Sequence, residues 1–96
     1  MRLVYSREAV ADLARLREFI ADNNPDAAAR IAADLIARID HLCAFPKMGR
    51  GVSSAPDPEM VRDFIFGKYV VRYLVSDQAI VILRIWHHYE DTEDRT

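Results

Sequence analysis

Apolar residues recur every three or four positions along two stretches in the first half of the chain. The two stripes are Ala9, Leu13, Leu16 and Ile20, then Ile31, Leu35, Ile39 and Leu42. This spacing predicts two amphipathic helices, one capped by Ser6 and running to about Ala21, the other starting at Pro25 and running to about Ala44. Because the segment between them is short, we expect an antiparallel helical hairpin.

Shorter apolar segments with the pattern of β-strands lie on either side of these helices. Residues 2–5 form one candidate strand, and residues 60–89 predict three strands joined by tight turns at Gly67-Lys68 and Asp77-Gln78. A long loop, residues 47–59, precedes them, and such loops in small domains are typically functional or mobile. The order of elements predicts an α+β fold, β-α-α-β-β-β, in which the helical hairpin packs on a small, mainly antiparallel sheet.

Counting residues outward from the two turns gives a register for the strands. Arg62 then lies opposite Tyr73, and Val71 lies opposite Arg84. The first face carries Arg62, Tyr73, Arg84 and Trp86, and the second carries Arg72, His87, Val61, Ile65, Val70, Leu74, Val81, Leu83 and Ile85. We expect the second, more aliphatic face to pack on the helices, so that Arg62 and Arg84 converge on the open face.

The composition is typical of one globular domain, which we expect to span residues 1–96. The chain is 51% hydrophobic and 29% charged, and its formal net charge of −2 argues against a protein that binds nucleic acid mainly through phosphates. The longest apolar run, residues 79–83, is too short to span a membrane, and no signal peptide is evident, so a cytoplasmic location is expected. The single cysteine, Cys43, falls on a helix stripe and is expected to be a small core residue.

The strongest candidate for chemistry is the segment Trp86-His87-His88-Tyr89 at the end of the last strand. A histidine beside the strand arginines could serve as general acid or base in phosphodiester cleavage, with the arginines holding the phosphate. Alternatively, the aromatic rings cap the end of the sheet and the histidines lie at a solvated edge. For contact with a macromolecular partner, the functional interpretation of this segment is the stronger one.

Other candidate sites are weaker. Lys47 and Arg50 in the long loop would add positive charge near the open face, although a solvated loop is the simpler interpretation. A metal site is not expected, because His87 and His88 are adjacent on a strand and point to opposite faces, and no second pair of ligands is present. Cys43 lies on a helix stripe, which gives no support to nucleophilic catalysis.

Four local strings, in their order along the chain, resemble the RelE/ParE superfamily of bacterial type II toxins. They are residues 6–13, 42–50, 69–73 and 82–88. Combined with the expected strand, helical hairpin, loop and three-stranded meander, they cover nearly the whole chain and match the ParE-like branch in kind and place. The resemblance implies a cytoplasmic toxin of growth arrest and plasmid stabilisation that needs no cofactor and is neutralised by a co-encoded antitoxin.

This superfamily contains two activities. RelE-like members cleave mRNA on the ribosome without a metal ion, and ParE-like members inhibit DNA gyrase. Ribonucleases that resemble RelE and YoeB tend to carry an arginine where this chain has Val70, and they tend to be strongly basic, unlike this chain. His88-Tyr89 nevertheless resembles the ending of the YoeB-like ribonucleases. We therefore predict gyrase inhibition, with ribosome-dependent cleavage of mRNA as the alternative.

The two activities assign different roles to the same side chains. The expected gyrase-binding residues are Arg62, Arg84, Trp86, His87, His88, Tyr89, Lys47 and Arg50. In a ribonuclease, Arg62 and Arg84 would stabilise the charge on the phosphorane, while His87 or His88 would move protons together with Tyr89. The antitoxin is expected to cover apolar surface between the hairpin and the sheet. A third interpretation is an inactive toxin that serves only as a co-repressor.

Overall fold

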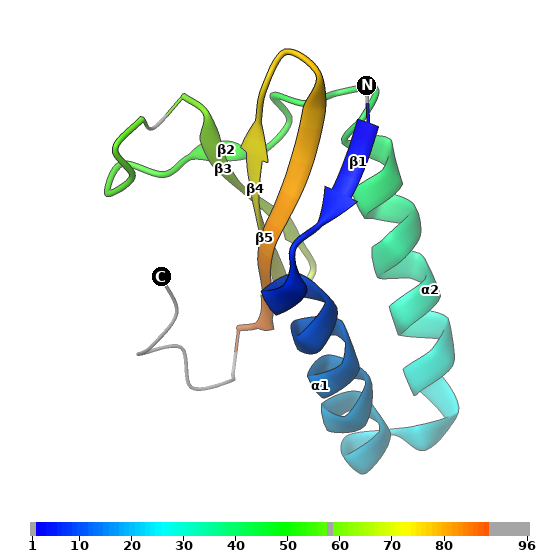
Figure 1. The fold of residues 1–96 in the computed structure, drawn as a ribbon. Helices are drawn as coiled ribbons and strands as arrows, with labels where there is room; N and C mark the ends of the chain where they lie inside the picture. The colour runs from blue at the N-terminus through cyan, green and yellow to red at the C-terminus, as the bar shows by residue number, and fades with distance from the viewer. Residues whose placement is uncertain (1, 58, 89–96) are drawn as a thin grey trace.

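The computed structural model describes residues 2–57 and 59–88. Its elements are β1 (Arg2–Tyr5), α1 (Arg7–Asn23), α2 (Pro25–His41), β2 (Arg50–Gly51), β3 (Val61–Phe66), β4 (Tyr69–Val75) and β5 (Ala79–His87). The two helices form a hairpin beside a five-stranded sheet (Figure 1). The predicted α+β fold is therefore confirmed, with one strand more than expected, because two residues of the long loop pair with β3 as β2.

Both helices begin at the residues whose capping chemistry predicts a start. The Ser6 side chain accepts a hydrogen bond from the Ala9 N–H, and the Asn24 side chain accepts one from the Ala27 N–H. The Asn24 backbone N–H also bonds to the Ile20 carbonyl at the end of α1. One residue thus ends the first helix and starts the second, which explains how the hairpin turns within so short a segment.

The sheet is mixed, with the strand order β1-β5-β4-β3-β2. β1 pairs with β5 in parallel, whereas all other neighbours are antiparallel. The register of β3 against β4 is the one expected from the Gly67-Lys68 turn, with Arg62 opposite Tyr73. Gly67 has a φ of 58°, the left-handed conformation that glycine adopts without strain.

The predicted register of β4 against β5 fails halfway along the pair. From the turn, the pairing is regular as far as Tyr73 opposite Ile82, but the next pair is Arg72 opposite Arg84. Leu83 is therefore an extra residue, a β-bulge, and each later residue of β5 pairs one position away from the expected one. The expectation that Arg84 lies opposite Val71 is wrong, since Ile85 occupies that position.

The bulge is held by α1, at the point where β1 ends. β1 pairs with β5 only up to Tyr5, and beyond it Ser6 Oγ donates a hydrogen bond of 2.9 Å to the Leu83 carbonyl. Two residues later along β5, the Ile85 N–H donates a bond of 2.8 Å to Asp12 Oδ2. The side chains of Ser6, the N-cap residue of α1, and of Asp12 within α1 therefore replace a neighbouring strand along the second half of β5.

The helices cover the face of the sheet that carries Tyr73, which is not the face predicted for β3 and β4. Tyr73 is 0% exposed and belongs to the core. The fully buried core consists of Ala9, Leu16, Leu35, Ile39, Leu42, Val71, Tyr73, Ile80, Ile82 and Ile85. Past the bulge, Ile85 lies on the helix side as expected, because the extra residue returns the end of β5 to the predicted face.

We call the other side of the sheet the open face. Its residues are Val61, Asp63, Ile65, Val70, Arg72, Leu74, Val81, Leu83 and Trp86. The prediction placed most of these side chains beneath the helices because they are aliphatic. It failed because both faces of the sheet are apolar, and the helix side also takes the aromatic rings of Phe64, Phe66 and Tyr69.

Two smaller expectations also change. α2 ends at His41, so Cys43 lies in the turn after the helix and is half-buried, where a fully buried core residue was expected.

None of the helices in the described part of the chain is long and apolar enough to cross a lipid bilayer.

Candidate functional site

Arg62, on the helix side of β3, is occupied by contacts within the fold. Its guanidinium forms an ion pair with Glu59 at 3.0 Å and donates a hydrogen bond of 2.9 Å to the Gly49 carbonyl. The side chain therefore ties the long loop to the sheet at both ends of the loop. It is not positioned beside Arg84, because its cross-strand partner is Tyr73, whose side chain is in the core.

Arg84, at the bulge of β5, is held by a buried carboxylate. Two of its nitrogens donate hydrogen bonds of 2.8 and 3.1 Å to Asp12, which is 2% exposed. Asp12 also accepts hydrogen bonds from Arg15 and from the Ile85 N–H. Burial raises the pKa of Asp12, but the hydrogen bonds from Arg84, Arg15 and Ile85 outweigh burial, so the pKa lies below its ordinary value.

Arg72, on the open face of β4, is paired with the residue directly opposite on β3. Its guanidinium makes two hydrogen bonds to Asp63, of 2.8 and 3.0 Å. The same group lies 5.3 Å from the centre of the Trp86 ring, within range of a cation–π contact. The hydrogen bonds to Asp63 raise the pKa of Arg72 above its ordinary value.

The predicted convergence of Arg62 and Arg84 on one face is wrong. Arg62 shares the helix side with Tyr73, whereas Arg84 lies opposite Arg72 of the open face, one residue past the bulge. Each also has a carboxylate partner in the same chain, the exposed Glu59 for Arg62 and the buried Asp12 for Arg84. The geometry on which a shared phosphate- or target-binding role was based is therefore absent.

The predicted cluster at the end of β5 is split between the two faces of the sheet. Trp86 lies on the open face under Arg72, whereas the His87 ring packs between Phe19 and Tyr69 at centroid distances of 5.1 and 5.0 Å. His88 is exposed, and its backbone N–H bonds to the Lys68 carbonyl. Tyr89, also predicted as a site residue, lies outside the described residues.

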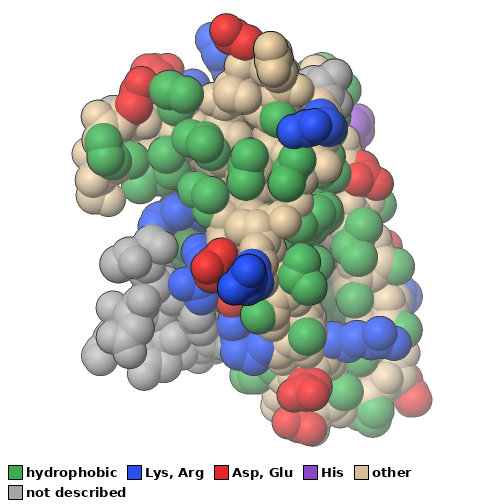
Figure 2. Space-filling view, in the orientation of Figure 1, with side chains coloured by type: hydrophobic (Ala, Val, Ile, Leu, Met, Phe, Trp, Pro, Cys, Tyr) green, Lys and Arg blue, Asp and Glu red, His purple; other side chains and the backbone are tan. Residues whose placement is uncertain are grey.

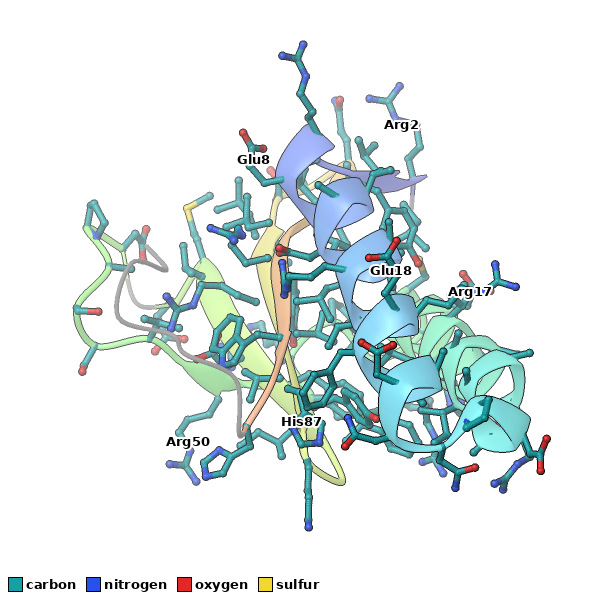
Figure 3. All side chains as sticks on the ribbon, turned by 90° about the horizontal axis from the view of Figure 1, so that it is seen from below. Arg2, Glu8, Arg17, Glu18, Arg50 and His87 are labelled. Atoms are coloured by element: carbon teal, nitrogen blue, oxygen red, sulfur yellow. The ribbon has the colours of Figure 1, made fainter. Side chains whose placement is uncertain are left out.

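Lys47 and Arg50 are both exposed, as expected of loop residues that could meet a partner. Figure 3 shows Arg50 projecting outward from β2, on the side of the molecule remote from the helices, while His87 lies beside α1. Lys47 borders a separate surface, at the end of α2. Lys47 and Arg50, which were predicted to act together with the strand arginines, therefore lie on different parts of the surface.

A hollow on the open face is the site that sequence patterns did not reveal. It has a volume of about 450 Å³ and is lined by Val52, Ser54, Ala55, Pro56, Val61, Arg72 and Leu83. Figure 2 shows hydrophobic side chains gathered over the upper part of this view, from the long loop across the strands. The arginine at its edge and the apolar walls suit an amphipathic protein segment.

The sequence signal for this hollow lies in the long loop, residues 47–59. Its Val52 N–H bonds to the Val61 carbonyl, which folds the loop against the edge of the sheet and makes Val52 a wall of the hollow. A valine and an alanine in a loop of glycine, serine and proline were the available sign of burial.

No metal centre is suggested by the described residues. Within residues 2–57 and 59–88, no group of three or more histidine, cysteine, aspartate or glutamate side chains lies close enough to hold an ion.

Comparison with known proteins gives consistent matches over most of the chain. A family model described as the ParE toxin of the type II toxin–antitoxin system parDE matches residues 3–92. Two relatives from Caulobacter vibrioides are similar along nearly their full length. Toxin RelE2 is 36% identical over 86 residues, which is 90% of this chain and 93% of the relative. Toxin RelE1 is 33% identical over 88 residues, which is 92% and 94% of the two chains.

Two solved structures share the fold. A chain of the chromosomal ParDE toxin–antitoxin system from P. aeruginosa aligns with a TM-score of 0.76 and 25% identity, covering 91% of this chain and 95% of that chain. A chain of the RelBE2 toxin–antitoxin complex from Mycobacterium tuberculosis aligns with a TM-score of 0.66 and 22% identity, covering 90% and 95%. The second likeness concerns the fold alone.

Proposed function

The chain belongs to the ParE toxin family of bacterial type II toxin–antitoxin systems, and we propose on this premise that it inhibits DNA gyrase. In this proposal the protein acts by binding, with no bond made or broken by its own side chains. A cognate antitoxin protein holds it inactive until the antitoxin is lost.

The observation that carries the choice of gyrase is the state of the three strand arginines. Arg62, Arg72 and Arg84 are each paired with a carboxylate of the fold, at 3.0, 2.8 and 2.8 Å. Stabilising a phosphorane requires cationic donors aimed at the place where its charge develops. A guanidinium already held by a buried or half-buried carboxylate, as Arg84 is by Asp12 and Arg72 by Asp63, is poorly suited to that task, which supports a binding toxin over a ribonuclease.

The arrangement of the histidine next to these arginines points in the same direction. His87 packs between two aromatic rings, Phe19 and Tyr69, on the helix side of the sheet. Trp86, its neighbour, lies on the open face together with Arg72. A general acid or base must reach the proton that it transfers, and aromatic packing on both sides favours a structural role for this ring.

We place the antitoxin on the open face of the sheet. The space between the hairpin and the sheet, where the sequence suggested it, is filled by core side chains such as Leu16 and Ile39. The hollow bordered by Val61, Leu83 and Arg72 offers apolar walls and a cation at one end. An amphipathic antitoxin segment with an acidic residue near that end would complement it.

Ribosome-dependent cleavage of mRNA is the second candidate, since both relatives from Caulobacter vibrioides carry the name RelE. The two candidates make different predictions for the same purified protein. Toxin freed of antitoxin should inhibit supercoiling by gyrase and accumulate cleaved DNA, and antitoxin added beforehand should prevent both effects.

The proposal fails if gyrase is unaffected while programmed ribosomes with bound mRNA show new cleavage products on adding the toxin. Growth arrest on expression without antitoxin separates both candidates from an inactive co-repressor, which would bind antitoxin and leave growth unchanged. Induction of the SOS response, as opposed to arrest of translation, would be the matching result in cells.

A further inference from the structure

Two large apolar side chains stand exposed on the segment that follows α2. Phe45 is 55% exposed and Met48 is 47% exposed. With Pro46 and Lys47 they line an open hollow of about 460 Å³, and we call these four residues the 45–48 surface. Single exposed apolar residues are common on proteins, but an aromatic ring and a methionine that share a hollow resemble the anchor of a binding site.

The 45–48 surface is held rigidly from beneath by Tyr73. The Tyr73 hydroxyl accepts a hydrogen bond from the Gly49 N–H and donates one to the Pro46 carbonyl, both at 2.8 Å. Arg62 adds a bond of 2.9 Å to the Gly49 carbonyl. Because Tyr73 is completely buried and points to the helix side, the surface lies on that side of the sheet and not on the open face.

Gly49 is required by this arrangement. A Cβ atom at this position would lie 2.6 Å from the Tyr73 hydroxyl oxygen and 2.8 Å from the Asp63 carbonyl oxygen. The backbone at residues 46–49 therefore has a fixed shape before any partner binds. A surface already ordered loses less conformational entropy on binding, which favours affinity.

The charge on this surface indicates the chemistry of its partner. Lys47 lies between Phe45 and Met48 in the chain, is exposed, and takes part in no ion pair within the described part of the chain. It also borders the next hollow, which Met60 and Val75 line together with the acidic residues Glu59 and Asp77. A partner carboxylate would therefore approach Lys47 from the side of Phe45 and Met48. A partner segment with an apolar side chain next to a carboxylate would fill the hollow and neutralise the lysine.

We propose that the 45–48 surface is where the toxin contacts its protein target, through such an acidic and apolar segment of that target. This inference rests on the proposed function, and it assigns target and antitoxin to different sides of the sheet. An antitoxin on the open face would then block the target sterically. It would not need to contact the target-binding residues themselves.

The test compares Phe45→Ser, Met48→Ser and Lys47→Glu with two controls, Val10→Ser and Lys47→Arg. Val10 is 56% exposed on α1, so its variant removes a comparable apolar side chain elsewhere. Three properties are measured: growth arrest on expression without antitoxin, the toxin concentration that inhibits gyrase by half, and antitoxin affinity. The thermal midpoint shows that each variant is folded.

The first three variants should lose growth arrest and need at least about tenfold more toxin for gyrase inhibition, which is the effect of about 1.4 kcal/mol at an anchor residue. Their affinity for antitoxin should stay within about threefold of wild type, and both controls should behave as wild type. Lys47→Arg keeps the charge that the acidic partner requires.

Three results would overturn the inference: growth arrest by the serine variants as strong as that of wild type, a parallel loss of antitoxin binding, or a wild-type toxin that arrests no growth. Failure of the gyrase assignment looks different. In that case wild type arrests growth without inhibiting gyrase, and the effect of the variants on growth still decides whether the 45–48 surface contacts the target.

Discussion

β1 ends at Tyr5 while β5 continues to His87, so the second half of β5 needs other partners along that edge. Asp12 supplies one of them, because its carboxylate accepts the Ile85 N–H and at the same time holds Arg84. A carboxylate that is 2% exposed is stable in its charged form only with such partners. Asp12 therefore helps to fix the position of α1 on the sheet, together with the hydrogen bond from Ser6 to the Leu83 carbonyl.

Replacing Asp12 by asparagine should lower the free energy of unfolding by about 3 kcal/mol, the lower end of the cost of breaking a buried ion pair. The lower end applies because the guanidinium of Arg84 is partly exposed to water. Urea denaturation at neutral pH measures the change. Asp34→Asn, at an exposed position of α2, is the control and should change stability by less than about 0.5 kcal/mol.

The stability that Asp12 contributes should also depend on pH. Its pKa in the folded protein is lowered, so the contribution is complete above the pKa of the unfolded chain, about 3.9. It is lost as the pH falls through the lower, folded pKa. The difference in unfolding free energy between wild type and Asp12→Asn should be constant above about pH 5 and shrink below about pH 4. A difference that stays constant down to pH 2 would contradict the charged state assigned to Asp12.

At the scale of the elements, the segment that joins α2 to β2 depends on one hydroxyl group. Tyr73→Phe should lower the free energy of unfolding by about 1–2 kcal/mol, because the Gly49 N–H and the Pro46 carbonyl both lose their partner. Hydrogen exchange at the Gly49 amide should become faster than in wild type. Tyr69→Phe is the control, since no hydrogen bond involves the Tyr69 hydroxyl within residues 2–57 and 59–88. Unchanged exchange at Gly49 would show that the loop is held by other contacts.

The elements themselves could be predicted from the sequence where the signals are local. The Ser6 and Asn24 caps located both helix starts, and the Gly67-Lys68 turn located the β3–β4 register. The bulge at Leu83 could not be predicted in this way. It depends on Ser6 and Asp12, which are more than seventy residues distant along the chain, and on the early end of β1.

The candidate site could not be predicted for a similar reason, because contacts that are distant in sequence also decide which face of the sheet is buried. Side chains alternate between the two faces of a strand. One error about which face is buried therefore assigns every side chain of the strand to the wrong face. Arg62 and Arg72 exchanged faces for that reason. Their carboxylate partners were equally hidden, because Asp12 reads on the sequence as one more polar residue of an amphipathic helix.

At the scale of the whole molecule, the two faces of the sheet differ in what they leave accessible. We predict that Leu83→Asp, which puts a charge into the hollow of the open face, weakens antitoxin binding at least about tenfold. Ile36→Asp, at an exposed position of α2, should bind as wild type does. Isothermal titration of purified antitoxin into each variant measures the affinity. Normal binding by Leu83→Asp together with weak binding by Ile36→Asp would move the antitoxin to the helices.

The pairing of β1 with β5 also has a consequence during synthesis of the protein. Arg2 lies opposite Ala79, so β1 has no neighbouring strand until β5 has been synthesised. A nascent chain can form its helical hairpin early, but β1 joins the sheet only after β5 has emerged. The five-stranded sheet is therefore completed only after residues 79–82, the part of β5 that pairs with β1, have been synthesised.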